Sequence, residues 1–304
     1  MLEEPTFVES ARDEVTSLFT HLLASYTQIK GFYPTPSLYT QISYGANSLA
    51  QGCLELARAT DDRHYRRLAG LFATWYTGNN AAGATMYDST TGRGFDGIKA
   101  ADEINWNAGA ESTVCAVLTM LDTATHPQSA GPLDSTRTIA ADPFTTVEAE
   151  SGTINGSGSV ENGGWTGEAL VSGGQYVELQ PGGSVMIESG RNAGVYRPYV
   201  IIERDEFDPN GVLSVEVGDS VAPLTVGDAG SKYYWMETVE AFDFEEGETV
   251  TLQYDGPSDS SVAVDAVVLQ PAVEFRIAGD GGYERWGVAR NVVDETRSRS
   301  VPVN

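Results

Sequence analysis

Acidic side chains in and just after one long polar loop are the first candidates for catalysis. The loop covers about residues 77–106 and is rich in Gly, Asn and Asp. Asp96 and Glu103 lie in it, and Glu111 follows it in an expected helix. Two facing carboxylates, one an acid of raised pKa and one a base or nucleophile, cleave glycosidic bonds. We therefore take Asp96, Glu103 and Glu111 as candidate catalytic residues, although a first-turn position also gives Glu111 a structural explanation.

Other catalytic chemistries find little support in the sequence. His21, His64 and His126 have no metal-ligand spacing, and no Ser/His/Asp grouping, phosphate loop or dinucleotide fingerprint is visible. The two cysteines, Cys53 and Cys115, sit in apolar helical contexts, which favours buried thiols and leaves a disulfide as the alternative.

The charge of the chain excludes two classes of partner. Asp and Glu number 43 against 18 Lys and Arg, for a net charge of −25, and only three residues are lysines. Such a surface repels nucleic acid and anionic membranes, so neither is expected as a partner. The carboxylates are spread along the whole chain, which is typical of adaptation to molar salt in a halophilic, haloarchaeal-like organism. We expect no membrane span. Because MLEEPTFVES has no apolar signal core, we expect a cytoplasmic location, with an extracellular one as the alternative if the start is truncated.

Hydrophobic periodicity divides the chain into two main parts. Residues 1–127 predict four antiparallel helices, at about 7–30, 37–59, 61–76 and 107–125. Residues 126–144 contain three prolines and few large apolar residues, which predicts a linker over 128–144. Short alternating runs over 145–271 predict about eight strands of an antiparallel sandwich. The last segment, 272–304, has two more strand candidates that either extend the sandwich or pack on the helices.

The second part resembles carbohydrate-binding modules of families 6 and 35, which are jelly-roll-like sandwiches. The resemblance rests on the runs 147–150, 160–162, 233–235 and 264–267 (VEAE, VEN, YYW and VDAV). It implies a structural Ca²⁺ held by Glu148, Glu150 and Asp265, a donor set that suits a hard cation. Sugar rings also need an aromatic platform, for which the candidates are Trp165, Tyr196, Tyr233, Tyr234 and Trp235. Ala263 stands where family members often carry a sugar-contacting Asn, so the sandwich is either a glycan site or a structural accessory.

Residues 38–121 resemble the closing part of an (α/α)6 toroid, the architecture of many glycoside hydrolases and polysaccharide lyases. The resemblance rests on the runs 44–47, 75–80, 86–88, 95–98 and 105–112. It implies a cleft in which Tyr44, Trp75, Asn79 and Asn107 contact substrate. A toroid has twelve helices and this chain about four. The open helical layer therefore has to pack on the rest of the chain, form a homo-oligomer, or meet a partner subunit that completes the barrel.

The expected fold class is thus multidomain: an N-terminal antiparallel α-helical, partial-toroid domain and a C-terminal antiparallel β-sandwich. The expected function is carbohydrate binding or processing, as part of a glycoside hydrolase- or lyase-like assembly. Two alternatives stay open, a non-catalytic glycan-binding protein and a structural assembly subunit. No organic cofactor is expected.

Overall fold

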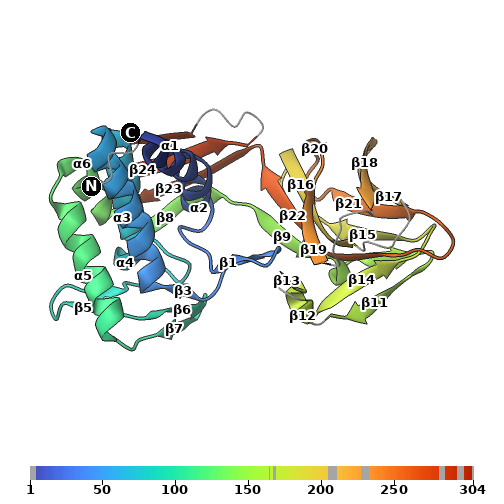
Figure 1. Ribbon diagram of the computed structural model, residues 1–304, viewed down its shortest axis with the longest axis horizontal. Helices are drawn as coiled ribbons and strands as arrows, with labels where there is room; N and C mark the ends of the chain where they lie inside the picture. The colour runs from blue at the N-terminus through green and yellow to red at the C-terminus, as the bar shows by residue number, and fades with distance from the viewer. Residues whose placement is uncertain are drawn as a thin grey trace. The chain divides into compact units, whose positions relative to one another are not determined.

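The structure is a computed structural model, and its ribbon is drawn in Figure 1. It describes residues 5–163, 165–166, 169–204, 211–226, 233–280, 285–292 and 298–302. The chain forms two compact units, and each is discontinuous in sequence. Unit 1 comprises residues 1–30, 38–143 and 273–304, and unit 2 comprises 31–37 and 144–272.

The helices of unit 1 pack around one buried helix. They are α1 (Pro5–Glu14), a π-helical turn (Val15–Phe19), α2 (Thr20–Ser25), α3 (Ser43–Thr60), α4 (Arg63–Thr77), α5 (Ala110–Ala124) and α6 (Pro127–Ala130), followed by a 3₁₀ turn (Gly131–Asp134). Asp62 caps α4, because its side chain accepts a hydrogen bond from the His64 backbone N–H at 2.8 Å. Gly78 ends this helix at φ +122°. Tyr65 and every residue from 68 to 76 are buried, so α4 is the central helix.

The predicted partial-toroid helical domain is wrong, because sheets make up a large part of unit 1. Strands β3 (Gln41–Ile42), β6 (Gly97–Ala100) and β7 (Glu103–Asn105) form a three-stranded sheet, and the last two of them lie within the expected loop. Strands β4 (Tyr87–Asp88) and β5 (Arg93–Gly94) form a hairpin. Because residues 41–42 pair with β6 as strand β3, helix α3 begins at Ser43 and not at the expected Ser37. Across both units the described chain is predominantly β.

A second sheet of unit 1 joins segments that are distant in sequence. Its order is β25 (Ser298–Pro302), β24 (Arg285–Asn291), β23 (Val273–Gly279) and β8 (Arg137–Asp142), all antiparallel. Residues 128–144, expected as a linker, therefore contain most of α6, the 3₁₀ turn and β8. The segment after residue 272, whose position was left open, pairs with β8 and packs on the helices.

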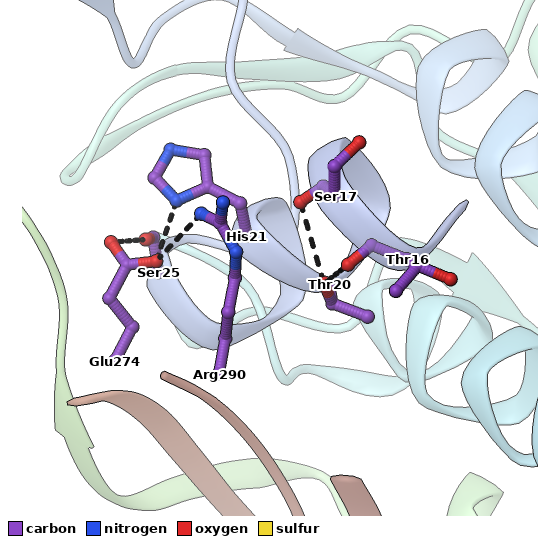
Figure 2. Close-up of polar contacts among 7 residues, drawn as sticks. All are labelled: Thr16, Ser17, Thr20, His21, Ser25, Glu274 and Arg290. Carbon is purple, nitrogen blue, oxygen red and sulfur yellow. Dashed lines mark hydrogen bonds and ion pairs between the residues drawn. The ribbon is translucent and has the colours of Figure 1, made fainter. Parts of the chain in front are cut away.

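One buried glutamate ties this sheet to helix α2. Glu274 on β23 is fully buried, and its Oε2 lies 2.7 Å from His21 Nδ1 and 3.7 Å from an Arg290 guanidinium nitrogen. Its Oε1 accepts a longer hydrogen bond from Ser25 Oγ at 3.4 Å, as Figure 2 shows. The carboxylate is thus paired with groups from α2 and β24 at once, as a buried charge requires.

Unit 2 is a sandwich of two antiparallel sheets. One has the order β10 (Thr153–Asn155), β15 (Ser184–Glu188), β21 (Thr249–Asp255), β17 (Gly211–Val217) and β18 (Ser220–Val226). The other has the order β11 (Gly158–Asn162), β14 (Gln175–Leu179), β22 (Val262–Pro271), β16 (Gly194–Arg204) and β19 (Tyr233–Thr238), with β20 (Phe242–Phe244) on β16 and β9 (Thr145–Glu148) on β22. Alternating residues of the two inner faces, among them Leu213, Val215, Leu252, Val177 and Val264, form its core.

Strand β22 is unusual because all ten of its residues are buried. One face of a strand in a two-layer sandwich normally meets solvent. Here short elements lie over it, namely the 3₁₀ turns Ala149–Ser151 and Ser172–Gly174 and the hairpin of β1 (Gly31–Phe32) and β2 (Pro36–Ser37). A further pair, β12 (Trp165–Thr166) and β13 (Ala169–Leu170), completes the unit. No helix among the described residues of the chain is long and apolar enough to cross a membrane.

Replacing Glu274 with alanine tests the buried contact of Figure 2. The substitution leaves Arg290 and His21 without their carboxylate, and loss of one partner from a buried pair costs roughly 3 kcal/mol. The matched control is Glu55→Ala, which removes an exposed glutamate paired with Arg58 and should change the free energy of unfolding by about 0.5 kcal/mol or less. Chemical denaturation of both variants measures the difference. Equal stability of the two would contradict the assigned role.

Candidate functional site

Three carboxylates of unit 2 gather beside strand β22. Glu148 ends strand β9, Glu150 lies in the 3₁₀ turn that follows, and Asp265 lies in β22. The antiparallel register places Glu148 opposite Ala266, next to Asp265, so residues 117 positions apart become neighbours. Asp265 is fully buried, whereas Glu148 and Glu150 are half-buried. We call Glu148, Glu150 and Asp265 the carboxylate cluster.

Two hydroxyl residues from other segments contact the cluster. The Ser172 backbone N–H donates to Asp265 Oδ1 at 2.8 Å, and the Ser172 hydroxyl donates to Glu148 Oε1 at 2.7 Å. The Thr35 hydroxyl, in the turn between β1 and β2, donates to Asp265 Oδ2 at 2.7 Å. Gly173 adopts φ +62°, and a Cβ there would lie 2.6 Å from Glu150 Oε1, so this position requires glycine.

The cluster contains more negative charge than the surrounding donors compensate. Burial, together with the nearby charges of Glu148 and Glu150, raises the pKa of Asp265 to about 7 despite the opposing hydrogen bonds from Thr35 and Ser172. Burial also raises the pKa values of Glu148 and Glu150. Glu148 Oε2 and Glu150 Oε2 are buried oxygens that have no hydrogen-bond partner among the described residues. Unpaired buried anions are costly, so the cluster suits either protonation or a cation.

The donor chemistry of the cluster fits a hard divalent cation. Carboxylate, carbonyl and hydroxyl oxygens are the ligands that Ca²⁺ takes, and the two unpartnered oxygens are free to serve it. The carboxylates would have to approach one another further to ligate a single ion, because no group of three or more His, Cys, Asp or Glu among the described residues is arranged to hold a metal. Asp265 and Glu148 instead direct oxygens to Thr35 and Ser172.

The aromatic residues expected to stack on sugar belong to strands of unit 2. Trp165 belongs to β12, and Tyr234 and Trp235 belong to β19, but the side chains of these three residues lie outside the described part of the structure. The side chain of Tyr233 lies outside that part as well, whereas the fifth candidate, Tyr196, is a core residue. Its ring is buried against Phe244 at 5.3 Å between centroids, with the Arg191 guanidinium 4.6 Å from the ring centre.

In unit 1, two of the four expected substrate contacts are buried. Trp75 is fully buried and its indole N–H donates to Gln41 Oε1 at 2.9 Å. Asn79 is also buried, where its amide donates to Thr74 Oγ1 at 3.0 Å and accepts from Thr138 Oγ1 at 2.8 Å. Both side chains therefore hold the fold together in this structure. Tyr44 and Asn107 are exposed.

The three expected catalytic carboxylates occupy different environments. Asp96, just before β6, accepts hydrogen bonds from the Gly109 N–H at 3.2 Å and the Ser112 hydroxyl at 2.6 Å, so it fixes the segment at which α5 begins. Glu103 is exposed and pairs with Lys99 at 3.0 Å. Glu111 is exposed in the first turn of α5. Their catalytic role stays a prediction.

Sequence reasoning missed Thr35, Ser172 and Gly173. Thr35 lies between two prolines, a pattern that indicates only a turn, and nothing local links it to residue 265. Gly173 and Gly174 follow Ser172, and such a pair signals backbone that needs positive φ. That signal could have marked the turn, although not its carboxylate neighbours.

Comparisons with known proteins give partial matches to parts of solved structures. No protein-family model and no curated protein matches the chain. An exo-β-1,3-galactanase from Phanerochaete chrysosporium, solved with galactose, is 19% identical over 43% of this chain and 30% of its own, with a TM-score of 0.34. The C-terminal family 6 carbohydrate-binding module of a Zobellia galactanivorans laminarinase is 15% identical over 42% of this chain and 98% of its own, with a TM-score of 0.33.

A match of the same quality is an insecticidal crystal protein, 10% identical over 42% of this chain and 21% of its own, with a TM-score of 0.36. The chain thus spans less than a third of the galactanase and of the crystal protein. Likenesses of this extent establish neither the overall fold nor the function of this chain.

The raised pKa of Asp265 predicts a pH dependence of stability in the metal-free chain. Its folded pKa of about 7 exceeds the ordinary value of 3.8, so its contribution is fully present below pH 3.8 and is lost as the pH rises through 7. The free energy of unfolding in EDTA should fall by a few kcal/mol across this window. Asp265→Asn should remove that fall, whereas Asp255→Asn, at the exposed end of β21, should not. Identical pH profiles for wild type and Asp265→Asn would contradict the assignment.

Proposed function

We propose that this protein binds carbohydrate through its β-sandwich unit, with the carboxylate cluster as a structural cation site beneath the binding surface. The observation that carries the proposal is the gathering of Glu148, Glu150 and Asp265 beside β22. These are the three residues that the resemblance to carbohydrate-binding modules implies as cation ligands. A chance acidic surface would not place one carboxylate in a fully buried strand and two more beside it.

The proposed cation is Ca²⁺, held by the carboxylate oxygens of Glu148, Glu150 and Asp265. When bound, it would supply the positive charge that the hydrogen-bond donors around the cluster do not. Glu148 Oε2 and Glu150 Oε2 are buried and have no partner in the part of the chain that the structure describes, and they are the atoms that support this role. Ser172 and Gly173 shape the turn against which the carboxylates lie. The cation would therefore fix the turns over β22 rather than take part in chemistry.

The proposed sugar contacts are Trp165 on β12 and Tyr234 and Trp235 on β19. Sugar rings present apolar C–H faces that stack on aromatic rings, while their hydroxyls need polar neighbours. Binding is proposed rather than turnover because Asp96 and Glu103 already have structural partners in unit 1. Hydrolysis or elimination, and a partner subunit or second copy, stay predictions.

Calcium should stabilise the sandwich through the carboxylate cluster. A ligand at 100 times its Kd stabilises the folded state by about 2.7 kcal/mol, so Ca²⁺ should raise the Tm of the EDTA-treated chain by several degrees. The effect should disappear in Asp265→Asn and persist in Asp255→Asn. An equal response to Ca²⁺ in wild type and Asp265→Asn would rule out this site.

Glycan binding by the intact chain tests the function itself. We would screen a glycan array in 1 M KCl with Ca²⁺, because at this ionic strength the Debye length is about 3 Å and the charge of −25 is screened. Trp235→Ala should weaken the selected glycan about tenfold in calorimetry, as expected for loss of one stacking ring. Phe7→Ala, which removes an exposed aromatic from α1 of unit 1, is the matched control. Absence of any bound glycan would overturn the proposal.

A further inference from the structure

An exposed aromatic pair lies at the end of the small sheet of unit 1. Trp106 follows β7 and Tyr44 lies in the first turn of α3, and each is 55% exposed. A large apolar ring that stays in water lacks about 2 kcal/mol of the stabilisation that burial would give. Two such rings at one end of a sheet therefore indicate a surface that contacts a ligand.

The backbone places these two residues at the same end of one small sheet. Strands β3, β6 and β7 lie side by side, with Ile42 opposite Gly97 and Gly97 opposite Asn105. Just beyond these strand ends, the Ser43 N–H donates to the Asp96 carbonyl at 3.1 Å. The Asp96 N–H in turn donates to the Asn107 carbonyl at 2.8 Å. Tyr44 and Trp106 each adjoin this row. Across three neighbouring strands the backbone spans two strand spacings, or about 10 Å, which is about the length of two linked sugar rings.

Trp106 is also held in a defined orientation. Its ring meets that of Phe95 edge to face, with 5.0 Å between centroids and 88° between planes. Phe95 in turn packs against the buried cluster that includes Trp75, Tyr76 and Met86, and its N–H donates to the Met86 carbonyl at 2.9 Å. A ring fixed from one edge and open to solvent binds a ligand without losing its own freedom.

Polar side chains surround the aromatic pair. Asn105 Oδ1 accepts a hydrogen bond from the Asn107 N–H at 3.2 Å and Asn105 Nδ2 donates a long one to Asp96 Oδ2 at 3.4 Å, which together orient the amide next to Trp106 and leave its second N–H for a ligand. The exposed Asn107 side chain and the Glu103 carboxylate offer further partners for hydroxyl groups. Asp96, Asp102, Glu103 and Glu111 are acidic neighbours in sequence, against the one cation Lys99, so an anionic sugar would be repelled.

We propose that Trp106, with Tyr44, Asn105 and Asn107, is a second carbohydrate-binding site, located on unit 1, that takes uncharged sugar rings. The inference rests on the proposed carbohydrate function but uses no residue of the sandwich. Trp106 is the stacking platform, Tyr44 flanks it, and the two asparagines hydrogen-bond to sugar hydroxyls.

The test uses the full chain and two variants of one residue. Neutral hexasaccharides from the glycan screen are titrated into wild type, Trp106→Phe and Trp106→Ala, with Phe7→Ala as the control and circular dichroism to verify folding. The difference in fluorescence between wild type and Trp106→Phe isolates the Trp106 emission. The neutral sugar should protect this emission from acrylamide, an uncharged quencher, and an oligogalacturonate of equal length should not.

We expect Trp106→Ala to weaken one class of sites at least tenfold, Trp106→Phe to have a smaller effect, and Phe7→Ala to have none. If the chain binds glycan but acrylamide still quenches the Trp106 emission as strongly as without sugar, this inference is overturned while the sandwich proposal stands. If no glycan binds anywhere, both are overturned. A change in sedimentation on Trp106→Ala with unchanged sugar affinity would also overturn it, because the ring would then be a contact between protein chains.

Discussion

The arrangement of the sandwich depends on keeping one carboxylate inside a strand that has no solvent-facing side. Asp265 is the single charged residue in β22, whose ten positions are all buried. An isolated buried charge is too costly to tolerate, so the chain has to bring polar groups to it. Ser172 and Thr35 do so from two distant segments, and Gly173 provides the close approach. The turns that cover β22 can be understood as the consequence of that need.

Unit 1 also contains a buried carboxylate, but different groups stabilise it. Glu274 is also a carboxylate in a central strand, fully buried in β23. Its oxygens face His21 and Arg290, so groups able to carry positive charge come from the protein itself. The carboxylate cluster instead receives its hydrogen bonds from hydroxyl and amide groups, and two of its oxygens have no partner among the described residues. This contrast is the reason that we propose an external cation for the cluster and none for Glu274.

Local pattern predicted the elements better than their arrangement. The amphipathic segments did become α3, α4 and α5, because caps and apolar spacing act within a few residues. The prediction of a partial toroid was wrong because helical periodicity does not reveal that strands within the expected loop pair with one another. It also does not reveal that β8 pairs with β23, more than 130 residues later in the chain. In the candidate site, family resemblance identified the carboxylate cluster. Thr35 could not be predicted, since its contact depends on tertiary packing alone.

The seven residues 31–37 leave the first unit, join the sandwich unit, and are followed by residues that return to the first. The polypeptide therefore crosses between the units four times, at residues 30–31, 37–38, 143–144 and 272–273. Neither unit corresponds to one continuous stretch of coding sequence. Recombination that moved residues 144–272 into another gene would leave behind the hairpin that donates to Asp265, so the sandwich is not a freely exchangeable cassette. The two units of this protein are consequently bound to be inherited together.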